Sequence, residues 1–231
     1  MASKKETITM DQASREFYLD FEGKKDQPPM MCGVMVEGDF SQVVFDQAFE
    51  PAVRHAHQEQ GRPIQMADRD AFLTSLVERA IREDRHLIAF SNHELEVLKE
   101  IEGIDEGVVD GYINARPIIR RWRNRVHPRA GKKAMEYRKW CRKNKDTSKK
   151  ARKDYHNKVG FRLIDYLKLI GIKVSTAHAP GKQTARMAAI LSGLKRTSGE
   201  YSGLTPTQKG KWTKLLNHNK LDVEGLRSLM A

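Results

Sequence analysis

The sequence predicts an α/β fold in which helices flank a mixed sheet of three antiparallel strands followed by parallel strands. Three observations support this prediction. The chain opens with three strand candidates separated by turn residues, a pattern typical of antiparallel strands. Near residue 86 the pattern changes to a short apolar run followed directly by a helical segment, which is typical of parallel strands. A basic segment with little apolar periodicity predicts a helical insertion in this fold.

The three N-terminal strands are predicted from alternation and turn chemistry. Residues 16–22 alternate between apolar and polar side chains, which predicts a strand with one buried face. Asp20 and Glu22 share one face of this strand, and the other face carries Phe17, Leu19 and Phe21. Met31–Val36 and Val43–Phe49 are the other two candidates, because Gly and Asp between them favour a turn.

A helix that covers the sheet is predicted after Asp68, which can cap it. Its apolar stripe at helical spacing consists of Phe72, Leu73, Leu76, Val77, Ala80 and Ile81. His86–Phe90 is a short buried strand candidate, and another helix starts at Ser91. Val108–Asp110 predicts either a further short strand or the entry to a helix that runs through Trp122.

The last third of the chain is predicted to be helical. Core-facing patterns occupy residues 161–169 and 184–194. Thr205 begins a capping box, with Pro at the first helical position, before a helix that leads towards His218. A last helix is expected from Leu221.

The net charge of +12 is concentrated in one segment. Residues 116–158 hold 18 Lys or Arg against three acidic residues, so the rest of the chain is slightly acidic. From Arg129 this segment predicts one or two polar helices, interrupted near Asn144–Ser148. A concentrated basic segment suits docking on a polyanion, because neutralised phosphates release their counterions. Nucleic acid, either DNA or RNA, is therefore the leading partner.

Aromatic side chains lie among these cations, so base stacking can add to phosphate contacts and would suit single-stranded ends. The predicted nucleic-acid contacts are Arg120, Arg121, Trp122, Arg123, Arg125, Lys132, Lys133, Arg138, Lys139, Trp140, Arg142 and Lys143. The alternative is a solvated pair of surface helices, or a site for an acidic protein partner. No base-reading motif is visible, so sequence-specific recognition is not indicated.

Several protein classes are not indicated by the composition. No apolar run approaches the length of a membrane span, and the polar first residues lack the apolar stretch of a secretory signal. A cytoplasmic protein without a membrane partner is expected. Cys32 and Cys141 give neither a disulfide framework nor a zinc-ligand spacing, so reduced thiols are predicted.

The acidic pair on the first strand is the leading chemical motif. The carboxylates of Asp20 and Glu22 project from one face, where burial without a partner would be costly. Hard divalent cations such as Mg²⁺ or Mn²⁺ take carboxylate oxygens as ligands. The pair alone is weakly specific, because Asp222 and Glu224 repeat the same spacing. An exposed acidic strand face is the alternative.

Three blocks of sequence resemble the DEDD superfamily of 3′-to-5′ exonucleases, and most closely its divergent members found beside RecB-like nuclease domains. Tyr18–Gly23 resembles the opening strand with its Asp-x-Glu. His86–Leu98 is similar to the strand-to-helix junction that carries the third acid. His218–Leu226 is similar to the closing motif, in which Tyr or His precedes the last Asp.

The resemblance implies a ribonuclease H-like fold and a metal-dependent exonuclease that hydrolyses phosphodiester bonds. It implies that two Mg²⁺ or Mn²⁺ ions are held by Asp20, Glu22, Glu94 and Asp222. His218 is expected to accept the proton of the attacking water, since imidazole titrates near neutral pH. Asp110 remains the alternative third acid. Residues 1–115 and 159–231 would form the nuclease core, and residues 116–158 the basic helical insertion.

These residues also have purely structural explanations. Ser91 and Glu94 have the spacing of a capping box, and Asn219 with Asp222 has a similar spacing at the start of the last helix. The rival functional hypothesis is a catalytically inactive nucleic-acid-binding or assembly subunit on the same fold. Endonucleolytic cleavage by the same metal site is a third possibility.

Overall fold

A computed structural model describes residues 8–24, 27–104, 107–144, 162–174 and 183–231. The elements in chain order are α1 (Met10–Arg15), β1 (Phe17–Gly23), β2 (Pro29–Val36), β3 (Asp39–Val44), η1 (Gln47–Phe49), α2 (Glu50–Gln58), β4 (Ile64–Met66), α3 (Arg69–Arg82), β5 (Leu87–Ala89), α4 (His93–Lys99), α5 (Gly107–Asp110), β6 (Tyr112–Asn114), α6 (Ala115–Val126), α7 (Pro128–Lys143), α9 (Leu163–Leu169), α10 (Gln183–Arg196) and α11 (Pro206–Met230).

The sheet has six strands in the order β4-β3-β2-β1-β5-β6. β1 pairs antiparallel with β2, and β2 pairs antiparallel with β3, whereas β5 and β6 continue the sheet parallel to β1. The predicted α/β fold with three antiparallel strands followed by parallel strands is thus confirmed. The edge strand β4, parallel to β3, and the helix α2 before it were not predicted.

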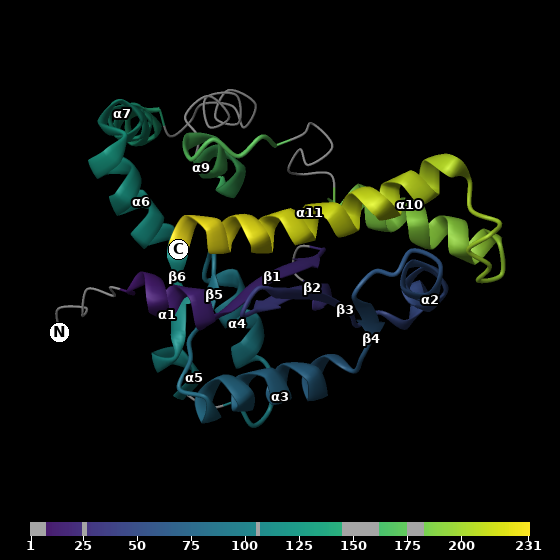
Figure 1. Cartoon of the computed structure of the whole chain (residues 1–231). Coiled ribbons are helices and arrows are strands. Elements are labelled where there is room, and N and C mark those ends of the chain that lie inside the picture. Colours follow the sequence, from purple (N-terminus) through teal and green to yellow (C-terminus); the bar gives the residue numbers. More distant parts are fainter. Residues whose placement is uncertain (1–7, 25–26, 105–106, 145–161, 175–182) are drawn as a thin grey trace.

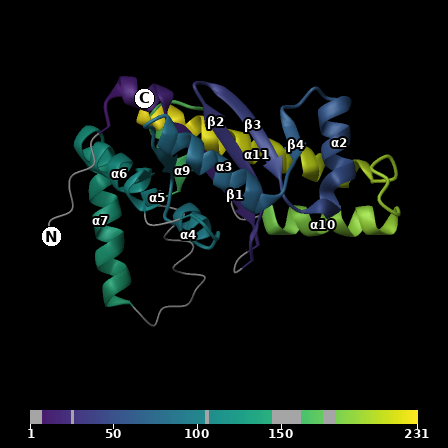
Figure 2. The ribbon, with the colours of Figure 1, turned by 90° about the horizontal axis from the view of Figure 1, so that it is seen from below.

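Helices cover both faces of the sheet (Figure 1). On one face, α3 and α4 pack over the apolar side chains of β1 that point away from Asp20 and Glu22, including Phe17 and Leu19. On the other face, α11 runs across the sheet, with α10 and α2 towards β4 and with α9 and α6 towards β6 (Figures 1 and 2). β1 is therefore a central strand whose polar face meets α11.

Three local predictions were wrong. The third strand was predicted at Val43–Phe49, but β3 is Asp39–Val44. It starts directly after the turn at Gly38 and ends before Asp46, which accepts a hydrogen bond from the Ala48 amide at 3.0 Å and starts the turn η1. Val108–Asp110 is the helical turn α5 and not a strand, and the strand β6 follows it. Ile81 is 59% exposed and lies outside the buried stripe of α3. The predicted cap of α3 is confirmed, since Asp68 accepts from the Ala71 amide at 2.9 Å.

The C-terminal segment is one helix of 25 residues rather than the two that were predicted. Its N-terminus follows the prediction, because Thr205 caps it in a capping box with Gln208. Asn219 does not cap a second helix, since it lies in the middle of α11 and is fully buried. This continuity carries His218 and Asp222 over the polar face of β1.

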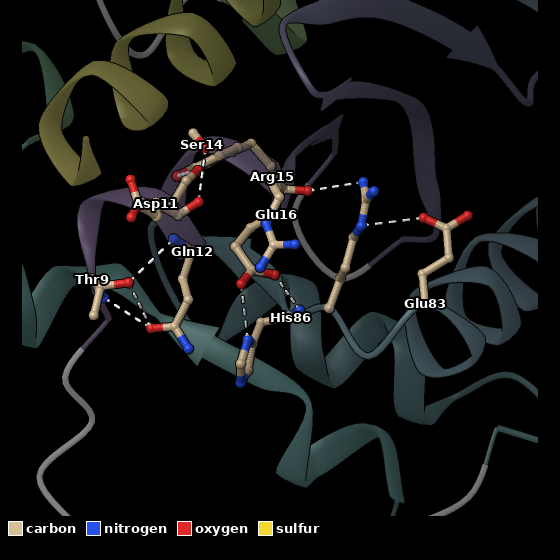
Figure 3. Close-up of polar contacts among 11 residues, drawn as sticks. Thr9, Asp11, Gln12, Ser14, Arg15, Glu16, Glu83 and His86 are labelled. Atoms are coloured by element: carbon tan, nitrogen blue, oxygen red, sulfur yellow. Dashed lines mark hydrogen bonds and ion pairs between the residues drawn. The ribbon is translucent and has the colours of Figure 1, made fainter.

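The N-terminal end of β1 is tied to β5 by charged side chains (Figure 3). Glu16 is 4% exposed and accepts hydrogen bonds from the backbone amide of His86 and, at 3.2 Å, from its ring Nδ1. Arg85 donates to the carbonyl oxygen of Arg15 at 3.0 Å and pairs with Glu83. These contacts hold the parallel pair β1–β5 in register at the end remote from Asp20 and Glu22.

The basic segment forms the helices α6 and α7 as far as Lys143, and residues 145–158 of it lie outside the described residues. α7 projects from the end of the sheet opposite to α2 and α10 (Figures 1 and 2). α7 ends at Lys143, and residues 145–148 of the predicted interruption lie outside the described residues. Neither cysteine is in a disulfide, as predicted.

Candidate metal centre

The strand β1 presents Asp20 and Glu22 to α11 because side chains alternate along a strand. Asp20 pairs with Gly33 and Glu22 with Met31 on the neighbouring strand β2. Glu22 is buried, and Asp20 is partly buried. Both carboxylates therefore lie on the covered face of the sheet, and not on an exposed acidic strand face.

The helix α11 adds His218 and Asp222, which lie one turn apart. Nε2 of His218 is 3.4 Å from Oδ2 of Asp222 and 3.7 Å from Oε1 of Glu22. One ligand atom from each of Glu22, His218 and Asp222 lies within 4.8 Å of the others. Two residues of the helix, His218 and Asp222, thus meet Glu22 of the strand, although the two elements lie far apart in the sequence.

Glu94 approaches from the parallel side of the sheet. β5 ends at Ala89, which pairs with Leu19, so the start of α4 lies beside the end of β1. Glu94 is 6% exposed, and its Oε2 accepts a hydrogen bond from the Ser91 hydroxyl at 2.9 Å. The capping explanation thus holds in part, but the charge of Glu94 also raises the pKa of both Asp20 and Glu22.

Asp110, the alternative third acid, does not belong to this cluster. It is exposed and lies at the end of α5, just before β6. Tyr112, the first residue of β6, pairs with Leu87, which in turn pairs with Phe17. Asp110 therefore lies at the opposite end of the sheet from Glu22, and Glu94 is the third acid that the geometry favours.

Burial raises the pKa of all four carboxyl groups, and neighbouring acids add to the shifts of Asp20 and Glu22. Burial raises the pKa of Glu22 to about 8 and that of Asp222 to about 7, and the charge of Asp222 adds to the shift of Glu22. The pKa of Asp20 is raised well above its usual range, first by burial and then by Asp222 and Glu22. Burial also raises the pKa of Glu94, against the hydrogen bond from Ser91. Such a cluster is costly to ionise unless cations compensate it.

A buried amide network, not expected from the sequence, holds Asp20. Nδ2 of Asn219 donates to Oδ2 of Asp20 at 2.9 Å and to its carbonyl oxygen at 3.0 Å. Oδ1 of Asn219 accepts from Nε2 of Gln42 at 2.9 Å, and Gln42 also donates to the carbonyl oxygen of Leu216 at 3.0 Å. A Cβ atom at Gly33 would come within 2.4 Å of Oδ1 of Asn219, so glycine is needed for this approach.

A buried arginine on α10, also missed from the sequence, faces the same cluster. Arg186 is 7% exposed, and its charge lowers the pKa of Glu22 against the larger effect of burial. The only sequence signal was a basic residue within an apolar helical pattern, which is equally typical of a surface position. Its location depends on how α10 packs along α11.

The donor set fits hard divalent cations. Glu22 and Asp222 meet at His218, whereas Asp20 and Glu94 lie outside this tight group and act on it through their charge, since Glu94 raises the pKa of both Asp20 and Glu22. Carboxylate oxygens are the preferred protein ligands of Mg²⁺ and Mn²⁺. The imidazole of His218 beside them is compatible with Mn²⁺. Positive charge at this place would offset the mutual repulsion of the acids, which the surrounding protein compensates only in part.

The predicted nucleic-acid contacts on α6 and α7 are not equally accessible. Arg123 is 2% exposed, its Nη1 donates to the Tyr166 hydroxyl at 3.3 Å, and its guanidinium lies over that ring, so it is a core residue rather than a surface contact. Trp140 and Tyr137 are stacked with ring centroids 6.4 Å apart. Trp122 and Arg120 are partly buried, and the exposed members are Arg121, Arg125, Lys132, Lys133, Lys139 and Lys143. The side chains of Arg138 and Arg142 lie outside the described part.

Comparison of this chain with models of known protein families, with curated proteins and with solved structures gives no match. None of the helices in the described ranges combines the length and the apolar character that a membrane span requires.

Proposed function

We propose that this chain is a metal-dependent nuclease of the ribonuclease H-like fold, acting as a 3′-to-5′ exonuclease on single-stranded or frayed nucleic acid. Asp20, Glu22, Glu94 and Asp222 are the proposed ligands of two Mg²⁺ or Mn²⁺ ions. The strand order, with three antiparallel strands followed by parallel strands beyond β1, supports the fold assignment.

The observation that carries the proposal is a set of four acids from distant parts of the chain, in which Glu22 and Asp222 meet at His218 and the charges of Asp222, Glu22 and Glu94 raise the pKa of Asp20. They come from a central strand, the helix after β5 and the C-terminal helix, which are the three blocks of the DEDD resemblance. A structural role would be served at lower cost by neutral residues, because buried carboxyl groups that repel one another destabilise a fold. A bound cation removes this penalty.

Two bound divalent ions would supply charge stabilisation for the scissile phosphodiester and a more acidic water. We assign the proton of the attacking water to His218, and the proximity of its Nε2 to Oε1 of Glu22 at 3.7 Å and to Oδ2 of Asp222 at 3.4 Å supports this role. Asn219 fixes the carboxyl group of Asp20 through Nδ2. Asn219 thus orients the carboxylate of Asp20 for the metal ions, and His218 carries the proton of the attacking water out of the site.

The basic helices α6 and α7 support nucleic acid as the substrate. Their exposed cations can neutralise phosphates, and the stacked pair of Tyr137 and Trp140 offers an aromatic surface to bases. Neither feature distinguishes DNA from RNA.

The test is degradation of 5′-labelled single-stranded DNA and RNA with Mg²⁺, Mn²⁺ or EDTA. We expect a metal-dependent ladder that shortens from the 3′ end and is absent in Asp20→Asn. Glu224→Gln is the matched control, because Glu224 lies on α11 but pairs with Lys220 at the surface. Salt-sensitive binding without cleavage by the wild type would instead assign the chain as an inactive nucleic-acid-binding subunit.

A further inference from the structure

Arg186 is held rigidly by contacts that leave its charge next to the acidic cluster. Its Nη1 donates to Oε1 of Gln183 at 2.8 Å and lies 3.5 Å from the carbonyl oxygen of Lys214 on α11. α10 packs against α11 and contacts β1, the strand that carries Glu22, and Arg186 is buried. A planar guanidinium fixed in this way loses little freedom when it binds a further acceptor.

Gln183, one turn before Arg186, has an unused donor. It is 8% exposed, and its Nε2 is buried without a hydrogen-bond partner among the residues the structure describes. An unsatisfied buried donor costs about 1–3 kcal/mol, so such groups in folded proteins commonly await water or a ligand. Oε1 of Gln183 accepts a hydrogen bond from Arg186, so the two side chains lie together and can both donate to the same ligand.

The chemistry of the two side chains fits a phosphodiester. A phosphodiester carries one negative charge, and a planar guanidinium matches two of its oxygens. The side-chain amide of Gln183 adds an N–H donor that a phosphoryl oxygen can accept from.

We propose that Arg186 and Gln183 form an anion-binding subsite, which binds a non-bridging oxygen of the scissile phosphodiester beside the metal centre. This inference rests on the proposed nuclease function. In the hydrolysis, the oxygen of water bonds to phosphorus, and the bond from phosphorus to the 3′ oxygen of the preceding nucleotide breaks. That oxygen keeps the electron pair and gains a proton, and Arg186 stabilises the charge on the phosphoryl oxygens meanwhile.

The experiment compares Arg186→Gln, Arg186→Lys and Gln183→Ala with the wild type. Isothermal titration calorimetry with a deoxynucleoside 5′-monophosphate, in the presence of Ca²⁺, measures the subsite, and titration with Mn²⁺ alone measures the metal centre. Arg196→Gln is the matched control, since Arg196 lies on the same helix but is exposed, and its Nη2 donates to Oε1 of Gln208 at 3.4 Å.

We expect Arg186→Gln to weaken mononucleotide binding at least tenfold and to lower kcat about 100-fold, the usual effect of losing one such donor. Mn²⁺ affinity should be unchanged or higher, because a competing positive charge is gone. Arg186→Lys should recover part of the loss, and Gln183→Ala should weaken mononucleotide binding several-fold. Arg196→Gln should match the wild type.

The outcomes separate this subsite from the nuclease assignment. Mononucleotide binding that depends on Arg186 and Gln183 supports the subsite even if the wild type cleaves nothing, in which case only the nuclease assignment fails. Equal binding by the wild type and Arg186→Gln overturns the subsite, as does the absence of binding to the wild type. If Arg186→Gln does not fold, Gln183→Ala decides, and unchanged binding by that variant overturns the proposal.

Discussion

Replacing Asn219 by alanine should both destabilise the protein and weaken its metal centre. The side chain is fully buried and makes three hydrogen bonds, two as donor to Asp20 and one as acceptor from Gln42. Alanine removes all three and leaves a gap opposite Gly33, where no side chain can fill it.

The size of the loss follows from the partners that remain. Nε2 of Gln42 still donates to the carbonyl oxygen of Leu216, so it keeps a hydrogen-bond acceptor. The partly buried carboxyl group of Asp20 loses the hydrogen bond from Asn219, and this loss accounts for most of the destabilisation. With about 1 kcal/mol for each bond and an added cost for the acceptor left unsatisfied, we expect a loss of about 2–4 kcal/mol.

Metal affinity should fall for a separate reason. The hydrogen bond from Asn219 lowers the pKa of Asp20 against the effect of burial and of the neighbouring acids. Without that bond Asp20 holds its proton more tightly, and a metal ion must displace it. Mn²⁺ binding near pH 7 should therefore weaken, and raising the pH should recover part of the affinity.

Urea denaturation with EDTA measures the stability, and calorimetric titration with Mn²⁺ measures the affinity. Asn217→Ala is the control, because Asn217 lies on the same helix, is partly exposed and accepts one hydrogen bond from Arg62 at 2.9 Å. We expect that control to lose less than about 1 kcal/mol and to bind Mn²⁺ like the wild type. If the two variants behave alike, Asn219 does not position Asp20 and the reasoning is refuted.

Three further predictions concern the helix contact, the acids and the basic helices. Gly33→Ala should destabilise the protein and weaken Mn²⁺ binding, since its Cβ would displace the side-chain amide of Asn219 from its hydrogen bonds. Gly210 of α11 has open space around it, so Gly210→Ala should be neutral or stabilising by up to about 1 kcal/mol in the same denaturation experiments. The raised pKa values of Glu22, about 8, and Asp222, about 7, mean that the folded state holds more protons than the unfolded chain between about pH 4 and 8. Stability in EDTA should thus fall as the pH rises through this window, and a Glu22→Gln/Asp222→Asn variant with an equally steep fall would contradict the shifts. Trp140→Ala should weaken binding to single-stranded DNA by about 1–3 kcal/mol while the slope of affinity against salt stays constant, and a changed slope would argue against stacking.

Local patterns in the sequence predicted most of the elements that carry the acids. Alternation in residues 16–22 placed Asp20 and Glu22 on one face, because the period of a strand leaves no other arrangement. The helix after β5 was equally predictable from a short apolar run followed by Ser91 and helical residues. Each of these signals is contained within a few neighbouring residues.

The parts that were missed depend on contacts between distant segments. Asn219 looked like the cap of a new helix, since a polar residue in the middle of a helix is ordinarily unfavourable. Its partners Asp20 and Gln42 are 199 and 177 positions away, and no local pattern reveals them. The burial of Arg186 is hidden from the sequence in the same way, because it depends on the packing of α10 against α11.

The distance along the chain between β1 and α11 has a consequence for synthesis. β1 is made early and α11 late, and the hydrogen bond between Asn219 and Asp20 spans 199 positions. Contacts of such long range form slowly, since the entropy of closing the loop must be overcome first. A growing chain would carry the acids of β1 without Asp222 or His218, and so without a complete metal centre. If the chain is the proposed nuclease, Mn²⁺ would bind tightly only after α11 has packed on β1, so hydrolysis could begin only once the whole fold is in place.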